Sequence, residues 1–153
     1  VMPFESERFD GIVSLDVLYH EWVRSDSEAL GEMYRLLKPG GKLFLQLPAY
    51  EWLRSSHDEW SYTSRRYTAS KVDELLKASG FVNKKIGYRV CFLFPLAVIQ
   101  RRILKTKRSD LKAIHPFMNA LFKLIMSFEN FLALHVNFPF GLSVIGVAEK
   151  EER

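Results

Sequence analysis

The sequence predicts an α/β fold in which parallel strands alternate with helices. Short apolar runs rich in strand-forming residues alternate with segments of helical periodicity, and glycine or proline separates them. This alternation is typical of a parallel sheet with right-handed crossover connections. Hydrophobic residues make up 48% of the 153 residues, so we expect a single domain with a well-filled core over residues 1–153.

The first strand and the first helix are marked by clear local signals. The apolar run Phe9–Leu15 predicts a buried parallel strand. A helix is expected over Ser25–Leu37, because Ser25 and Glu28 have the spacing of a capping box. The segment Lys38-Pro39-Gly40-Gly41 is expected to end this helix, since proline cannot continue it and glycine accepts a left-handed turn.

A second strand and a second helix follow in the same order. The strand is expected over Lys42–Leu47, and a polar and aromatic loop occupies residues 49–67. Thr68 or Ser70 can cap a helix that extends through Ser79. A third strand is expected over Phe81–Tyr88, so residues 1–88 would form a core of strands and helices.

Residues 89–139 read as a helical insertion before a final strand within residues 140–150. The insertion begins apolar and then becomes basic, and its amphipathic end repeats large apolar residues at helical spacing. The basic residues are Arg101, Arg102, Lys105, Lys107, Arg108 and Lys112, and the apolar repeat is Phe117, Leu121, Leu124, Phe128 and Phe131. Neither apolar stretch reaches about 18 uninterrupted residues, so a transmembrane helix is not expected. The short approach to the final strand also suits an antiparallel edge partner.

Two sets of residues resemble a known family. The first set is Pro3-Phe4, Phe9-Asp10, Leu15-Asp16-Val17-Leu18, His20 and Arg35 with Leu36-Leu37-Lys38-Pro39-Gly40-Gly41. It resembles the C-terminal portion of class I S-adenosyl-L-methionine (SAM)-dependent methyltransferases. The second set, Pro48-Ala49-Tyr50, His57-Asp58 and Arg65-Arg66-Tyr67-Thr68, resembles a type 11-like subgroup of these enzymes.

The resemblance implies a Rossmann-like sheet of seven strands whose last strand is antiparallel. This chain would supply strands four to seven, with the helical insertion before the last one. The family's glycine-rich loop, which lets the backbone approach SAM closely, has no counterpart among the eight glycines. We therefore expect the chain to be truncated, with an upstream portion missing, and to be inactive and a weak SAM binder on its own.

Ligands of open parallel sheets lie outside the carboxyl ends of the strands, and the resemblance places site residues there. Leu15, Asp16 and His20 are expected to contact SAM, and His20 and His57 are candidate general bases, because histidine exchanges protons near neutrality. Asp58, Arg65, Arg66 and Tyr67 are candidate substrate-binding residues, since guanidinium groups bind phosphates and carboxylates bidentately. No metal site is expected.

Each of these roles has a structural alternative. Asp16 can cap the turn after its strand, and His20 and His57 can be ordinary loop histidines. Arg65 and Arg66 can pair with Asp58 or Glu59 instead of a ligand.

The predicted function is methyl transfer from SAM to a small or lipid-like acceptor. The alternative is a non-catalytic methyltransferase-like module that binds a membrane surface or a protein partner through residues 89–139. The single cysteine fits a cytoplasmic location, and the basic amphipathic insertion suits a peripheral membrane contact. If the chain is naturally truncated, a homo-oligomer that covers the exposed sheet edge is also expected. Nucleic acid binding is not expected, because the net charge is only +4 and no aromatic residues interleave the basic run.

Overall fold

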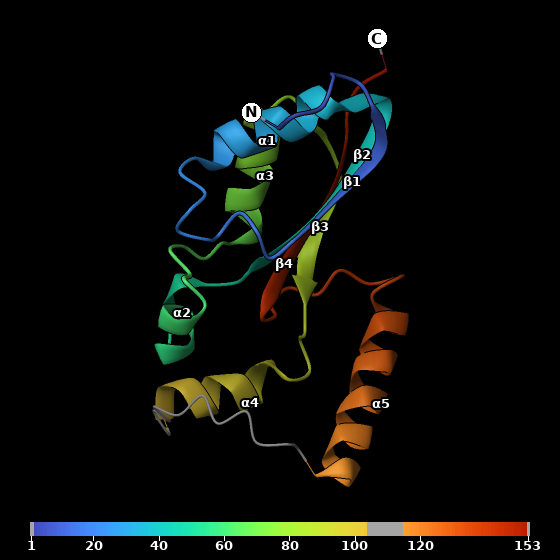
Figure 1. Ribbon diagram of the computed structural model, residues 1–153. Coiled ribbons are helices and arrows are strands. Elements are labelled where there is room, and N and C mark those ends of the chain that lie inside the picture. Colours follow the sequence, from blue (N-terminus) through green and yellow to red (C-terminus); the bar gives the residue numbers. More distant parts are fainter. Residues whose placement is uncertain (1, 104–114, 153) are drawn as a thin grey trace.

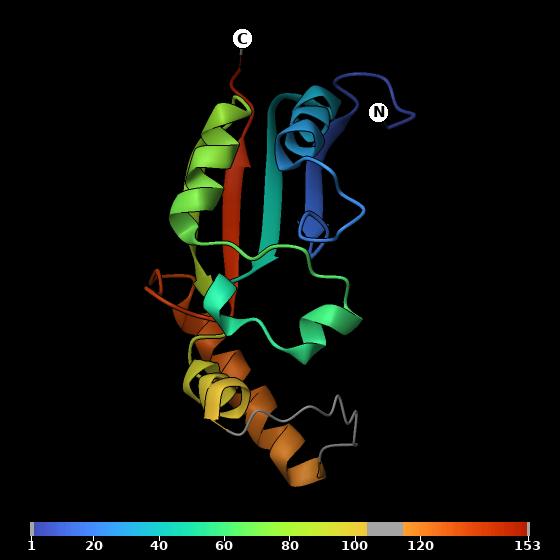
Figure 2. The same cartoon turned by 90° about the vertical axis from the view of Figure 1, so that its left-hand side faces the viewer.

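A four-stranded sheet forms the centre of the chain, with two helices against one of its faces (Figures 1 and 2). The computed structural model describes residues 2–103 and 115–152. The strands are β1 (Phe9–Leu15), β2 (Leu37–Pro48), β3 (Val82–Arg89) and β4 (Ser143–Glu149), in the spatial order β1-β2-β4-β3. The helices on the covered face are α1 (Asp26–Leu36) and α3 (Ala69–Ala78).

The strand directions confirm the predicted fold class. β1 pairs in parallel with β2, and β4 pairs antiparallel with both β2 and β3. β1, β2 and β3 therefore run the same way, and their last residues, Leu15, Pro48 and Arg89, lie at one edge of the sheet. We call this edge the carboxyl edge. The last strand is antiparallel, as the resemblance implied. It lies between β2 and β3 and not at the edge of the sheet, because it pairs with both of them, so the expected edge position was wrong.

The predicted start of α1 is confirmed, while the turn after it differs from the prediction. The side-chain oxygen of Ser25 accepts a hydrogen bond of 3.2 Å from the backbone N–H of Glu28. β2 begins at Leu37 instead of Lys42, because the backbone turns extended at Leu37 directly after the last helical residue. Gly40 permits the bend within this longer strand, since its φ of 73° is strained for any other residue.

Replacing Ser25 by alanine should destabilise the protein by about 1 kcal/mol, because one backbone donor at the start of α1 loses its acceptor. The free energy of unfolding, measured by urea denaturation, checks this. Ser127→Ala, at an exposed helical position of the insertion, is the control and should change the free energy of unfolding by well under about 0.5 kcal/mol. Equal losses in the two variants would contradict a capping role for Ser25.

Leucines from the strands and the two helices fill the core between the sheet and its covered face. Those of the core cluster with no more than 2% of their surface exposed are Leu30, Leu37, Leu43, Leu45, Leu47 and Leu76, and Leu18 joins them from the loop after β1. Apolar side chains removed from water in this way are the main favourable contribution to folding. The opposite face of β1 is open, and Val13 and Leu15 expose 67% and 53% of their surfaces.

Arg35 holds the segment before β1 against α1. Its guanidinium donates to the backbone oxygen of Phe4 at 3.0 Å and pairs with Glu32 at 3.0 Å. The hydrogen bonds from Arg35 and from the backbone N–H of Met2 lower the pKa of Glu32 to about 2. The arginine of the family motif therefore fixes the approach to β1.

The segment between β2 and α3 contains two short helices where a loop was predicted. They are η1 (Glu51–Leu53) and α2 (Ser56–Trp60). Asp58 stabilises the start of α2, because its carboxylate accepts a 2.8 Å hydrogen bond from the backbone N–H of Ser55. The periodicity of the sequence gives no signal for helices as short as these.

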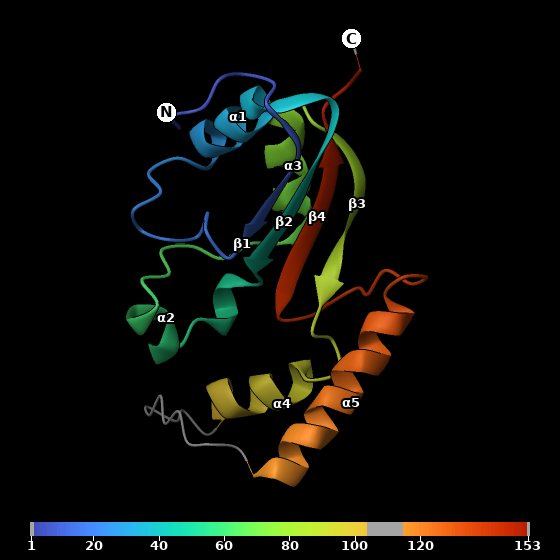
Figure 3. The same cartoon turned by 45° about the vertical axis from the view of Figure 1, so that its right-hand side comes forward.

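The insertion forms helices that extend beyond the carboxyl edge (Figures 1 and 3). α4 (Phe94–Val98) continues as a π-helical turn over Ile99–Ile103, and α5 is Pro116–Leu132. The basic residues Lys105, Lys107, Arg108 and Lys112 lie outside the described residues. None of the helices in the described part of the chain has the length and apolar character needed to span a bilayer.

Candidate functional site

The backbone at the carboxyl edge takes the same unusual conformation after each of the three parallel strands. Asp16 follows β1 with φ 53°, Tyr50 follows β2 with φ 54°, and Val90 follows β3 with φ 60°. Positive φ values are uncommon outside glycine, and such residues cluster at ligand sites and switch regions. Of the five non-glycine residues with positive φ in the described chain, three therefore follow the parallel strands at the carboxyl edge, while Glu7 precedes β1 and Tyr62 lies in the segment after β2.

Asp16 is held in place by the neighbouring strand. Its backbone N–H donates to the backbone oxygen of Gln46 at 2.9 Å. The side-chain amide of Gln46 in turn donates to the carboxylate of Asp16 at 3.1 Å. Both Leu15 and Asp16 are exposed, so the structure presents these two candidate cofactor residues to solvent at the end of β1.

His20 lies in an aromatic cluster on the loop after β1. Its ring centroid is 4.7 Å from that of Trp22 and 5.7 Å from that of Tyr62, and the Trp22 and Tyr62 rings are stacked at 6.1 Å. The His20 Nδ1 accepts a 3.3 Å hydrogen bond from the backbone N–H of Trp22. Trp22 and Tyr62 expose 79% and 53% of their surfaces, so solvent reaches this cluster.

A β-bridge joins the two loops that build this cluster. His20 pairs with Thr63 in antiparallel fashion, and the backbone N–H of Glu21 donates to the backbone oxygen of Tyr62 at 3.0 Å. The loop after β1 and the segment after β2 are therefore tied together beside the carboxyl edge. Residues far apart in the sequence thus meet around His20.

Arg65 and Tyr67 bind the same loop from the other side. Arg65 pairs with the carboxylate of Asp26 at 2.9 Å and donates to the backbone oxygens of Leu18 and Val23. The hydroxyl of Tyr67 donates to Asp26 at 3.0 Å. Burial and the nearby Asp26 carboxylate raise the pKa of Tyr67, so its hydroxyl keeps its proton.

Arg66 and Asp58 form a buried ion pair. Their side chains are only 5% and 1% exposed, and the Arg66 Nε lies 2.7 Å from the Asp58 Oδ1. Arg66 also donates to the backbone oxygen of Ala49 at 2.9 Å. Burial by itself would raise the pKa of Asp58, but the hydrogen bonds from Arg66 and from the backbone N–H of Ser55 lower it below its ordinary value.

The structure therefore brings the four predicted substrate residues, Asp58, Arg65, Arg66 and Tyr67, into internal contacts that shape the segment after β2. The pairing of Arg66 with Asp58 matches the structural alternative, whereas Arg65 pairs with Asp26 instead of Asp58 or Glu59. Their direct roles in substrate binding remain predictions. His57 lies in α2, and its side chain is not among those that the structure describes.

Sequence reasoning missed Trp22, Gln46 and Asp26. Trp22 stands close to His20 in the chain, and this aromatic neighbour of a candidate base was an available signal. Gln46 and Asp26 gave no such signal. Gln46 reaches Asp16 because of the register between β1 and β2, and Asp26 pairs with Arg65 because the segment after β2 folds back onto the loop after β1.

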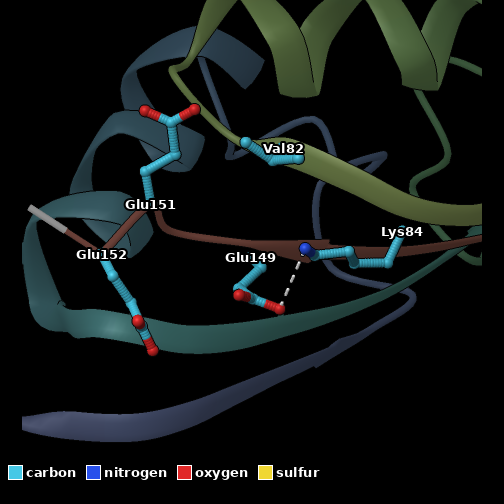
Figure 4. A pocket seen from close by; sticks show the side chains of 5 residues that line it. All are labelled: Val82, Lys84, Glu149, Glu151 and Glu152. Atoms are coloured by element: carbon cyan, nitrogen blue, oxygen red, sulfur yellow. Dashed lines mark ion pairs between the residues drawn. The ribbon is translucent and has the colours of Figure 1, made fainter.

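Two hollows lie away from the aromatic cluster. One, of about 350 Å³, follows the open side of β1 and is lined mainly by apolar side chains such as Phe4, Val13 and Met33. The other, of about 270 Å³, lies at the end of the sheet opposite the carboxyl edge, where β3 begins and β4 ends (Figure 4). There Lys84 and Glu149 point toward each other as an ion pair of 3.5 Å.

Comparison with protein families and with solved structures identifies the fold. Residues 1–45 match the family described as a methyltransferase domain, and no curated protein matches. A SAM-dependent methyltransferase from Thermotoga maritima has a TM-score of 0.61 at 16% identity, with 99% of this chain and 60% of that chain covered. The chain thus spans less than two thirds of that structure.

Two further structures show the same fold. Phosphoethanolamine N-methyltransferase 2 from Haemonchus contortus, in complex with SAM, has a TM-score of 0.55 at 21% identity, covering 97% of this chain and 35% of that one. A Haloferax volcanii structure, a complex between the Trm112 methyltransferase activator and a methyltransferase, has a TM-score of 0.56 at 15% identity, covering 99% and 58%. Residues 1–45 thus match the methyltransferase domain family, and the chain has the fold of these solved SAM-dependent methyltransferases.

Proposed function

We propose that the protein transfers a methyl group from SAM to a small or lipid-like acceptor at the carboxyl edge. The observation that carries this proposal is the cluster of His20, Trp22 and Tyr62 on the loop that follows β1 and Asp16, in a sheet with the class I methyltransferase topology. Ligands of open parallel sheets bind at this edge. The neighbour from Haemonchus contortus was solved with SAM bound, which supports the choice of cofactor.

The described residues fit one side of such a cofactor. Leu15 and Asp16 are exposed at the end of β1, where backbone atoms and a carboxylate fixed by Gln46 are available to it. When bound, SAM supplies the electrophilic methyl group. The faces of Trp22 and Tyr62 attract cations, such as a sulfonium or an amine acceptor.

We assign His20 as the general base that takes the proton from the acceptor atom. It lies at the same edge as Asp16. Its Nδ1 accepts a 3.3 Å hydrogen bond from the backbone N–H of Trp22, so Nδ1 is the basic nitrogen of the neutral ring, and it would exchange this hydrogen bond for the proton of the acceptor. We assign Arg65, Arg66, Asp58 and Tyr67 as positioning residues, because they hold the two loops that frame His20. Direct contacts of these four residues with the acceptor, and a catalytic role for His57, remain predictions.

The open side of β1 supports a site that further polypeptide completes. Val13 and Leu15 are largely exposed there, and the adjoining hollow of about 350 Å³ is apolar. Such a surface suits burial by additional strands and helices. No strand in the described residues is followed by a glycine-rich loop that would let the backbone approach SAM closely. We therefore expect SAM to bind weakly to this chain alone.

Calorimetric titration of SAM tests the proposed function. We expect little or no heat of binding with this chain and clear binding with a version extended at its amino end. Binding to this chain alone would show that the residues described here form a sufficient site. Absence of binding to both versions would overturn the assignment as an enzyme.

The alternative is a non-catalytic module that binds a partner through residues 89–139. The exposed apolar side chains of α5 favour some contact of this kind. The two functions differ in the titration, because a module of this kind need not bind SAM.

A further inference from the structure

Helix α5 presents three different faces around its axis. The inward face carries the partly buried residues Phe122, Ile125, Met126 and Leu132 with the buried Glu129. A polar strip carries Asn119, Lys123, Ser127 and Asn130. The third face, which we call the outward apolar face, consists of Phe117, Leu121, Leu124, Phe128 and Phe131. At about 100° per residue, these five side chains lie within an arc of about 80°.

The outward apolar face is open to solvent along its whole length. The exposed fractions of Phe117, Leu121, Leu124, Phe128 and Phe131 are 70%, 39%, 68%, 56% and 62%. Leu134, just beyond the helix, is 71% exposed. Single exposed apolar residues are ordinary, but a continuous row of this size marks an interaction surface.

The body of the protein fixes the orientation of α5. The fully buried carboxylate of Glu129 accepts hydrogen bonds from the backbone N–H groups of Val90 at 2.5 Å and Phe92 at 3.0 Å. Lys85 donates to the backbone oxygen of Ala133 at 2.9 Å. Because these contacts hold the inward side, rotation about the helix axis cannot hide the outward apolar face.

The charge of α5 and of the sequence just before it is positive. Glu129 is the only carboxylate in α5, and it is buried, while Lys123 is exposed. In the sequence just before the helix, residues 101–112 contain six lysines and arginines and a single acidic residue, Asp110. Basic residues beside an amphipathic helix favour surfaces of anionic lipid headgroups.

We propose that the outward apolar face of α5 binds the surface of an anionic membrane, with the helix lying in the headgroup region. The large side chains would enter the boundary of the acyl chains, and the exposed Lys123 would meet the headgroups. A second copy of the chain is a poorer occupant, because it would bring the same positive charge to the same place.

This orientation has a consequence for the acceptor, which rests on the proposed methyl transfer. α5 lies beyond the carboxyl edge, at the end of the sheet that carries His20 and Asp16 (Figure 3). Binding of α5 would therefore bring that edge close to the bilayer. The acceptor would then be a group carried on a membrane lipid or on a molecule anchored beside it.

Sedimentation with lipid vesicles tests the membrane contact without any need for activity. One set of vesicles is phosphatidylcholine alone, and the other combines it with an equal part of phosphatidylglycerol. We expect binding to the anionic vesicles, with binding reduced as salt is added. Leu124→Ser and Phe131→Ser should each weaken partitioning by roughly tenfold or more, because each removes one large apolar side chain from the lipid contact.

Trp60→Ser is the matched control, because Trp60 is equally exposed, at 75%, but lies on α2, outside the outward apolar face. It should leave partitioning unchanged, and circular dichroism should show that all three variants remain folded. No difference between the anionic and neutral vesicles, or equal losses in all three variants, would overturn the proposal. A third outcome is that the protein does not bind vesicles but forms dimers in sedimentation equilibrium, and that Leu124→Ser dissociates these dimers. This outcome would identify the outward apolar face as a contact between copies and would also overturn the proposal of membrane binding. Failure of SAM binding in the calorimetric titration would leave the vesicle result intact, so the two proposals fail separately.

Discussion

Replacing Arg66 by alanine should lower the free energy of unfolding by about 3–5 kcal/mol, because the Asp58 carboxylate would stay buried without its partner. The two side chains are 5% and 1% exposed, so water cannot easily take the place of the guanidinium. The backbone oxygen of Ala49 would also lose a donor. Urea denaturation of the protein and of the variant measures the difference.

The exposed pair of Lys71 and Glu74, at 4.0 Å, provides the matched control. Lys71→Ala should cost less than about 1 kcal/mol, since solvent screens exposed pairs. The double variant Asp58→Leu with Arg66→Met should be more stable than Arg66→Ala, because it removes the unpaired buried charge. A loss with Arg66→Ala no larger than that with Lys71→Ala would show that the buried pair contributes little to stability.

The same pair has a pH dependence with a definite sign. The folded-state pKa of Asp58 is lowered from the ordinary value of 3.8. The pair therefore contributes its stability above about pH 4, and this contribution is lost as the pH falls below 3.8 toward the folded-state value. Denaturation curves of Arg66→Ala should fall off less steeply with acid in that range than those of the unaltered protein.

Replacing His20 by alanine should reduce the rate of methyl transfer by about 10²-fold or more, the usual contribution of a positioned general base. His20 lies in the aromatic cluster on the loop after β1, and its Nδ1, the nitrogen with the free electron pair, accepts a hydrogen bond from the backbone N–H of Trp22. The rate is measured as release of S-adenosylhomocysteine by the SAM-binding form of the protein, with an acceptor found by screening amines, phenols and lipid headgroups.

His20→Asn separates proton transfer from positioning. The asparagine oxygen can still accept the hydrogen bond from Trp22, but the side chain cannot take a proton at neutral pH. Both variants should therefore lose similar activity while SAM affinity changes little. Near-normal rates in His20→Asn would show that His20 only orders the loop.

Much of the fold could be predicted from the sequence because its signals are local. The capping serine of α1, the apolar run of β1 and the glycine after α3 each depend on residues only a few positions apart. The start of β2 at Leu37 was not predicted. The proline and glycines after Leu37 indicated only the end of the helix, whereas pairing with β1 extends β2 through the bend that they form. The short helices η1 and α2 fall below the length at which periodicity is informative.

The candidate site was predictable only in part. Asp16 and His20 follow a recognisable strand, so their place at the carboxyl edge could be inferred. The pairing of Arg66 with Asp58 was open to inference, because the two residues are only eight positions apart in the segment after β2. The pairing of Arg65 with Asp26 was not, because it depends on how that segment returns across the loop after β1. That return is fixed by bridges such as His20 with Thr63, whose partners are distant in the sequence.

The sequence by itself determined the fold class, most element positions and the amphipathic character of residues 117–131, because these depend on composition and on short-range periodicity. Only the tertiary structure decided which apolar side chains of α5 are covered. The periodic pattern shows that a wide face is apolar, but the contacts of Glu129 with the chain after β3 determine which half of it faces the protein. Those contacts leave the half formed by Phe117, Leu124 and Phe131 exposed, because burial depends on neighbours that the chain brings together only when it folds.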